Sequence, residues 1–179
     1  MNLDELGGSA LKLLVFMARH PTAAKYAREI SREAGVSAGA ASQGLRRLEA
    51  GGFVSRKKRG KEFFYSLRTD SAAVRQAKIL FTLLELAPLV GELEKTSEKI
   101  VLFGSCARGT DTEESDVDLL VITEEKQKAL AAVRRFRTAK RVAPVVVSLN
   151  EWTEMRRTDR PFYDRAGSGM VLASRLGGG

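Results

Sequence analysis

The chain has little of what would crosslink a protein or hold it in a membrane. Its one cysteine, Cys106, excludes an internal disulfide and fits the reducing cytosol. Its apolar stretch ALKLLVFMA is too short to span a bilayer and is soon followed by polar residues. The first residues, MNLDEL, are acidic where a signal peptide would be basic. We therefore expect a cytoplasmic protein with no membrane segment, whose only histidine, His20, lies at a helix end.

Basic side chains outnumber acidic ones in this chain. Lys and Arg number 30 against 22 Asp and Glu, which gives a net charge of +8, and most of this excess lies in the first half of the chain. The densest stretch, residues 44–68, carries eight basic side chains and two acidic ones. A patch of this kind is typical of a surface that binds phosphates, although a solvated basic loop has the same composition.

Residues 7–70 begin with two patterns of helical spacing. The segment SALKLLVFMARHP predicts a first helix that Pro21 stops, and AAKYAREISREAG predicts a second. The inward faces are expected to comprise Leu11, Leu14, Val15 and Ala18 in the first helix, and Tyr26, Ala27, Ile30 and Ala34 in the second. Gly35 follows the second helix at the position that favours a left-handed residue.

A third helix and a hairpin complete this half. Ser37 can cap SAGAASQGLRRLEAGG, whose Ala41, Leu45 and Leu48 face inward. The segments FVSRKK and EFFYSLR have strand composition, and KKRGKE supplies a hairpin tip. This order resembles a winged helix-turn-helix domain, and the cadence AREISREAGVS…LRRLEAGGFV is typical of bacterial and archaeal regulators.

The resemblance implies that the third helix enters the DNA major groove. Its early positions, expected to be exposed, are Ala38, Gly39, Ala40, Gln43 and Gly44, of which only Gln43 has an amide that can pair with adenine. The remaining candidates for DNA contacts, chiefly to phosphate, are Ser37, Ser42, Arg46, Arg47, Lys57, Lys58, Arg59 and Lys61. We expect double-stranded DNA to bind with steep salt dependence and modest specificity, or with specificity drawn from DNA shape. The alternative is a winged domain that binds protein or RNA.

The next segment, SAAVRQAKILFTLLELAPLVGELEKTSEK, is expected to form a long helix that is interrupted near Pro88. Its apolar side chains exceed what one face against a small domain needs: Val74, Ala77, Leu80, Phe81, Leu84 and Leu86. Winged-helix regulators often dimerise through such a helix, so we expect a homodimer. The alternative is that the helix packs the two domains of one chain together.

The C-terminal half pairs a tight turn with two carboxylates. The apolar strand KIVLF ends at Gly104-Ser105, and a strand–turn–helix of this kind can seat triphosphate oxygens. SDVDLLVIT alternates as a strand, so Asp116 and Asp118 project from one face. Adjacent carboxylates repel one another unless a cation neutralises them, and oxygen ligands suit Mg²⁺ or Mn²⁺ that bridges the phosphates of a nucleotide.

Gly-Ser, ten residues and then Asp-x-Asp resemble the signature of minimal nucleotidyltransferases of the DNA polymerase β superfamily, and GSCARG and SDVDLLV match its surroundings. The resemblance implies a small mixed sheet with flanking helices, and transfer of a nucleotidyl group with release of pyrophosphate. The expected reaction takes AMP from ATP to a hydroxyl of a protein or nucleic acid.

The resemblance also implies roles for single residues. Gly104 and Ser105 would carry the phosphates, while Asp116 and Asp118 would bind the metal and serve catalysis. Arg108 would either assist the phosphates or pair with one of two nearby acids, Asp111 or Glu113.

One departure from the family pattern bears on catalysis. Active relatives have a third carboxylate on the next strand, which here should be APVVVSL, and Val145 stands where that acid belongs. Glu151 lies beyond the strand and is expected at a helix start rather than as a substitute. The loss of a general base costs about 10²–10⁴-fold in rate. Nucleotide binding needs only the remaining pair.

We therefore predict an α+β protein with three parts: a winged helix-turn-helix over residues 1–70, a linking or dimerisation helix over 71–97, and a minimal nucleotidyltransferase-like domain over 98–179. Two functions fit this organisation. One is an enzyme that transfers a nucleotidyl group. The other is a DNA-binding regulator whose C-terminal domain senses nucleotide without turning it over.

Overall fold

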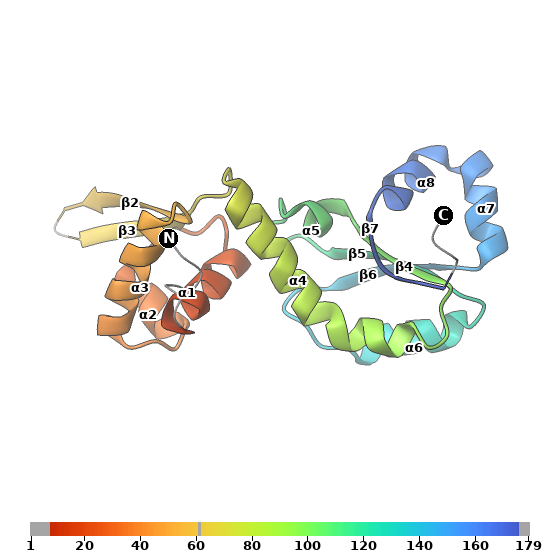
Figure 1. Cartoon of the computed structure of the whole chain (residues 1–179), viewed down its shortest axis with the longest axis horizontal. Coiled ribbons are helices and arrows are strands. Elements are labelled where there is room, and N and C mark those ends of the chain that lie inside the picture. Colours follow the sequence, from red (N-terminus) through yellow and green to blue (C-terminus); the bar gives the residue numbers. More distant parts are fainter. Residues whose placement is uncertain (1–7, 61, 176–179) are drawn as a thin grey trace. The chain divides into compact units, whose positions relative to one another are not determined.

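The structure is a computed structural model that describes residues 8–60 and 62–175, so the predicted DNA contact Lys61 lies outside the described residues. The chain divides between Lys78 and Ile79 into two compact units, each with its own helices and sheet (Figure 1). The fold class is α+β, as expected. None of the described helices combines the length and the apolar composition needed to cross a bilayer.

The first unit has the predicted order of three helices and a hairpin, with a short unpredicted strand before the second helix. Its elements are α1 (Gly8–Arg19), β1 (Lys25–Tyr26), α2 (Ala27–Glu33), α3 (Ala38–Ala50), β2 (Val54–Arg59) and β3 (Glu62–Leu67). The strands form a sheet in the order β1-β3-β2, in which β2 and β3 are the hairpin of the wing. Gly35 follows α2 with φ of +62°, and Ser37 caps α3 by accepting a hydrogen bond from the amide of Ala40, as predicted.

One predicted inward position of this unit, Leu11, and one predicted helical position, Tyr26, are wrong. Leu11 is 44% exposed, because the buried stripe of α1 instead contains Ala10, Leu13, Leu14, Met17 and Ala18. Tyr26 precedes α2 and belongs to β1, where it pairs with Phe64 of β3 and the two ring centroids lie 3.7 Å apart. Extended backbone at residue 26 gives the sheet its third strand, and helical spacing alone did not indicate this.

Gly44 was expected to be exposed among the early positions of α3, but it is buried. A Cβ at Gly44 would lie 2.6 Å from Cδ1 of Leu13 and 3.4 Å from Cα of Ala10, both on α1. The glycine therefore allows α1 and α3 to approach closely. The predicted inward residues of α3 (Ala41, Leu45 and Leu48) are all buried.

The second unit is built on a four-stranded mixed sheet in the order β6-β5-β4-β7. Its strands are β4 (Lys99–Phe103), β5 (Val117–Ile122), β6 (Val142–Val147) and β7 (Met170–Ser174). Its helices are α5 (Gly104–Arg108), α6 (Lys126–Arg135), α7 (Leu149–Thr158) and α8 (Arg160–Gly167), with the later part of α4 (Ala72–Leu93). β5 and β6 run parallel, whereas β4 is antiparallel to both of its neighbours.

Helices cover both faces of this sheet (Figure 1). Leu86, Leu89 and Leu93 of α4 pack with α6 against one face, and α7 and α8 cover the other. α4 runs without a break through Pro88, so the predicted interruption is wrong. This arrangement leaves one end of β4 and β5 for the turn at Gly104 and for the two aspartates.

Candidate functional site

Gly104 lies at the centre of the candidate site, between β4 and the single turn of α5. Its φ is +73°, a conformation that side chains disfavour. A Cβ at this position would lie 2.0 Å from Oδ2 of Asp118 and 2.9 Å from Cγ. Glycine is therefore required twice, for the backbone turn and for the space that the Asp118 carboxylate occupies.

The two aspartates stand where β5 begins. Asp118 pairs with Phe103 of β4 on one side and with Ala143 of β6 on the other. Asp118 and Leu120 share the face that α7 and α8 cover, whereas Val117 and Leu119 face α4 and α6. Asp116 directly precedes the strand. The structure thus brings Gly104 and Asp118 together, with Asp116 on the same edge.

Asp116 has a partner that the sequence did not suggest. Arg141 comes directly before β6, and its Nε donates to Oδ1 of Asp116 at 3.1 Å while its Nη2 donates to Oδ2. These hydrogen bonds from Arg141 lower the pKa of Asp116 below its usual value. A forked guanidinium–carboxylate pair of this kind fixes the orientation of both groups.

Asp118 has a different environment. Burial raises the pKa of Asp118, and the nearby negative charge of Asp116 adds to the shift, while the positive charges of Arg165 and Arg108 oppose it. Arg165 belongs to α8, where its Cζ lies 5.5 Å from the ring centroid of Phe162. Phe162 in turn packs edge to face on Phe103, the last residue of β4. Arg165 is a site residue that the sequence analysis missed.

A second ion pair holds the loop that carries Asp116. Lys140, the neighbour of Arg141, donates to Oδ2 of Asp111 and to the carbonyl oxygen of Thr112. The side chain of Asp111 is 4% exposed and that of Lys140 is 15% exposed. Lys140 and Arg141, which are consecutive, therefore each pair with an aspartate of the loop. The aspartate that pairs with Lys140, Asp111, was one of the two expected partners of Arg108.

The neighbouring strand β6 contributes no carboxylate. Ala143 lies opposite Asp118, and Val145 lies opposite Leu120, where it packs against an apolar cluster. Glu151 begins α7, as expected: its side chain accepts a hydrogen bond from the amide of Ser148 at 2.7 Å and pairs with Lys126. No acid on β6 or at the start of α7 is therefore directed to the aspartates.

A two-metal centre does not fit the donors that are present. Within residues 8–60 and 62–175 there is no group of three or more His, Cys, Asp or Glu side chains arranged to hold a metal ion. Of the two carboxylates at the site, Asp116 already accepts two hydrogen bonds from a guanidinium. A divalent cation at Asp116 would have to compete with Arg141.

The candidate DNA contacts lie on α3 and on the wing. Ser42, Gln43, Arg46 and Arg47 are exposed on α3, and Ser37 is exposed at its start. Lys57, Lys58 and Arg59 are exposed on β2. Arg56, beside them, pairs with Glu49 at 3.0 Å and stacks over the ring of Phe63, which keeps it on the wing.

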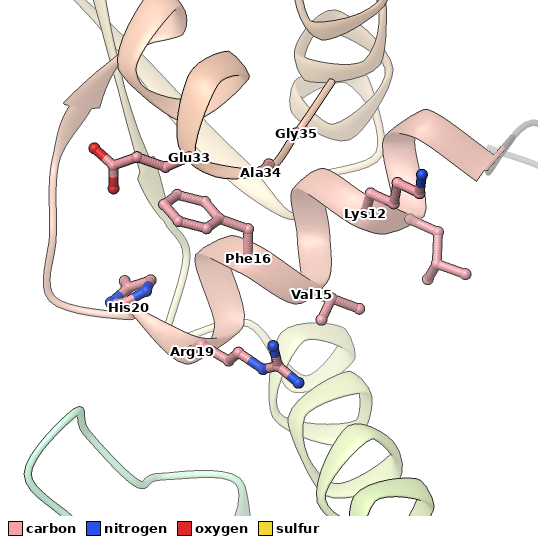
Figure 2. A pocket seen from close by; sticks show the side chains of 9 residues that line it. Lys12, Val15, Phe16, Arg19, His20, Glu33, Ala34 and Gly35 are labelled. Atoms are coloured by element: carbon pink, nitrogen blue, oxygen red, sulfur yellow. The ribbon is translucent and has the colours of Figure 1, made fainter. Parts of the chain in front are cut away.

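A depression between α1 and the end of α2 is a further feature that no sequence motif indicated (Figure 2). Its volume is about 760 Å³, and Val15 and Phe16 of α1, with His20 just after that helix, lie beside Glu33 and Gly35 (Figure 2). It is wide open to solvent. Phe16 and His20 pack against each other, with ring centroids 4.9 Å apart, which accounts for the only histidine at its helix end.

Each of the two units contains a match to the model of a known family. Residues 5–61 match the model of the MarR family, and residues 83–164 match the model of the nucleotidyltransferase domain. The chain joins a MarR-type winged helix to a nucleotidyltransferase domain. No curated protein matches it.

Three solved structures resemble parts of this chain. A homodimeric winged helix-turn-helix DNA-binding domain from Mycobacterium bovis is 23% identical over 49% of this chain and 74% of its own, with a TM-score of 0.35. A predicted DNA-binding transcriptional regulator from E. coli is 26% identical over 47% and 83%, with a TM-score of 0.36. A candidate nucleotidyltransferase from Sulfolobus solfataricus is 21% identical over 58% and 90%, with a TM-score of 0.40.

Proposed function

We propose that this protein is a DNA-binding regulator whose nucleotidyltransferase domain binds a nucleoside triphosphate, ATP by preference, and does not transfer its nucleotidyl group efficiently. The main support is that Ala143 of β6 pairs with Asp118 and Val145 pairs with Leu120, so β6 brings no carboxylate to the side of Asp118. Without a third acid the attacking hydroxyl lacks a general base, which costs about 10²–10⁴-fold in rate. Binding of phosphates does not require that base.

The second candidate is nucleotidyl transfer itself. It is supported by the complete Gly104-Ser105 and Asp116-x-Asp118 pair of motifs, and by the close approach of Asp118 to Gly104. In this case Mg²⁺ or Mn²⁺ would bind the two aspartates and supply electrostatic stabilisation of the phosphates. The acceptor would be a hydroxyl of a protein or nucleic acid.

DNA binding is proposed for the winged unit on the basis of its exposed cations. Lys57, Lys58 and Arg59 follow one another on β2, and Arg46 and Arg47 stand on α3. Cations on a helix and a wing suit the phosphates on either side of a groove, and Gln43 offers one amide for base contacts. We expect double-stranded DNA as the partner of this surface.

We further propose that the protein is a homodimer that pairs through α4. Leu80 and Leu84 stand one helical turn apart and are 52% and 64% exposed. A second copy of the same helix would cover both side chains in a two-fold arrangement that suits two-fold DNA sites.

The deciding experiment measures DNA binding and chemistry on the same samples. Duplexes of about 30 base pairs would be selected by the protein from a random pool, and their affinity measured with and without ATP. Pyrophosphate release would be assayed in parallel with Mg²⁺ and with Mn²⁺. The proposal expects ATP to change DNA affinity several-fold while pyrophosphate stays at the background of protein-free samples.

Two results would contradict the proposal. Sustained pyrophosphate release that Asp118→Asn abolishes would favour the transferase. Equal DNA affinity at all ATP concentrations, with no ATP binding by calorimetry, would exclude nucleotide sensing. Glu154→Gln serves as the matched control for charge, because Glu154 is an exposed carboxylate of the same unit that pairs with Arg157 on α7.

A further inference from the structure

We propose that the nucleotide site binds its triphosphate directly through arginine side chains, with Arg141 serving beside Asp116 in place of a divalent cation, so that binding does not require a metal. This inference rests on the proposed function, since it concerns the same nucleotide site. It assigns Arg141, Arg165 and Arg108 as phosphate ligands and makes the site independent of Mg²⁺.

The balance of charge at the site supports this assignment. Two carboxylates, Asp116 and Asp118, are accompanied by three guanidinium groups: Arg141 is bonded to Asp116, and Arg108 and Arg165 act on Asp118. Metal-dependent phosphate sites instead gather carboxylates that leave an excess of negative charge for the cation. At the present site Arg141 already pairs with Asp116, so the charge that a cation would compensate there is balanced, and the remaining donors of this exposed guanidinium can attract a polyphosphate anion.

Arg141 is both held in place and accessible. Its carbonyl oxygen accepts a hydrogen bond from the amide of Val117 at 2.9 Å, which fixes its backbone to the start of β5. Lys140, one residue earlier, is anchored on the buried carboxylate of Asp111. The side chain of Arg141 is nevertheless 78% exposed. A guanidinium has five N–H donors, and the pair with Asp116 uses two of them.

The short turn at Gly104 indicates that side chains, and not a helix dipole, would bind the phosphates. α5 comprises only the five residues Gly104–Arg108, a single turn that adds little helix dipole. Phosphate binding at this turn therefore depends on nearby cations. Arg165 of α8, beside Phe162, and Arg108 at the end of α5 come from separate elements, and Arg141 comes from the segment that directly precedes β6. Three arginines from three segments can surround a chain of phosphates.

Whether removal of Arg141 weakens, strengthens or does not change ATP binding distinguishes three possible roles of this residue. A merely structural ion pair predicts unchanged ATP affinity. A blocking contact predicts tighter binding once Arg141 is removed, with or without metal. A phosphate ligand predicts weaker binding without metal, and new dependence on Mg²⁺, because Asp116 is then a free carboxylate that repels phosphate until a cation neutralises it.

The test is calorimetry of the full chain with ATP, and with inorganic tripolyphosphate, each in EDTA and in Mg²⁺. The wild-type protein is expected to bind both probes in EDTA within about threefold of the affinity in Mg²⁺. Arg141→Gln is expected to weaken binding in EDTA by about tenfold or more, the usual effect of losing charge-assisted hydrogen bonds. Mg²⁺ should restore part of the loss. Arg141→Lys should fall between the two, and Arg157→Gln should match wild type.

The failures are distinguishable. ATP binding by the wild-type protein only in Mg²⁺ overturns this inference and leaves the proposed nucleotide binding intact. Unchanged or tighter binding by Arg141→Gln in EDTA also overturns it. The absence of ATP binding in both conditions overturns the proposed function and the inference together. Binding of ATP but not of tripolyphosphate shows that the base, and not the phosphate chain, carries recognition, which also contradicts the assignment.

Discussion

The carboxylate of Asp118 lies directly over Cα of Gly104, so closely that a methyl group on that carbon would stand 2.0 Å from Oδ2. The two residues are distant in sequence and belong to different elements, but each limits what the other can be. A side chain at residue 104 would displace the carboxylate and would also have to adopt φ near +73°.

Gly104→Ala is therefore expected to destabilise the protein by about 1–3 kcal/mol, through the unfavourable backbone conformation and the displaced aspartate. It should also abolish ATP binding. Urea unfolding and calorimetry measure the two effects. Gly91→Ala is the matched control: Gly91 lies within α4 with nothing within 4 Å of its added Cβ, so alanine should stabilise by about 0.5–1 kcal/mol. Equal stability of the two variants would contradict the proposed clash.

Lys140→Met is expected to be more damaging than most single substitutions. It breaks the ion pair of Lys140 with Asp111, whose side chain is 4% exposed, and breaking a buried ion pair costs about 3–5 kcal/mol. The double variant Lys140→Met/Asp111→Leu removes both charges and should recover most of that loss. Urea denaturation of both variants checks the prediction. A double variant as unstable as the single one would show that the pair contributes packing rather than charge compensation.

Replacement of the three wing cations, Lys57, Lys58 and Arg59, by glutamine should weaken DNA binding to all sequences alike. The slope of log affinity against log salt should fall by about two to three, because each cation that contacts a phosphate contributes close to one. Gln43→Ala should instead alter sequence preference with little change in the slope. Lys95→Gln, an exposed lysine of the second unit, is the control. An unchanged salt slope in the triple variant would exclude the wing from the DNA interface.

Leu84→Glu should convert the proposed dimer to a monomer, since a carboxylate at the exposed apolar position of α4 would be buried on association. Analytical ultracentrifugation at micromolar concentration measures the change. Gln76→Glu, which adds the same single negative charge at an exposed position earlier in the same helix, is the control. A wild-type chain that sediments as a monomer would remove the basis for two-fold DNA recognition.

Local sequence patterns predicted the helices and the hairpin of the winged unit, but not the contacts between residues that are distant in sequence. Ser37, Gly35 and the wing hairpin followed from capping, a left-handed residue and strand composition, all of which act within a few residues. Tyr26 was misplaced because its strand exists only through pairing with Phe64, far along the chain. Gly44 was misplaced for a similar reason, since its role depends on Leu13 of another helix.

The candidate site shows the same division. The sequence predicted four site residues because they form a motif with fixed spacing: Gly104, Ser105, Asp116 and Asp118. Arg141 was not predicted, because the parallel register of β5 and β6 decides which residue stands beside Asp116, and the α6 crossover conceals this register. Arg165 reaches the site only because α8 packs Phe162 on Phe103. The one sequence signal that could have indicated Arg141 was the pair of basic residues, Lys140 and Arg141, directly before the strand.

The ion pairs that join Asp111 to Lys140 and Asp116 to Arg141 also set an order of events in biosynthesis. Each aspartate leaves the ribosome well before its basic partner, with the whole of β5 and α6 synthesised between them. The hairpin of β4 and β5 can pair as soon as both strands emerge, whereas the acids stay uncompensated until residues 140 and 141 follow. The candidate site is thus completed late in folding, and a nascent chain halted before β6 carries Asp111 and Asp116 without Lys140 and Arg141.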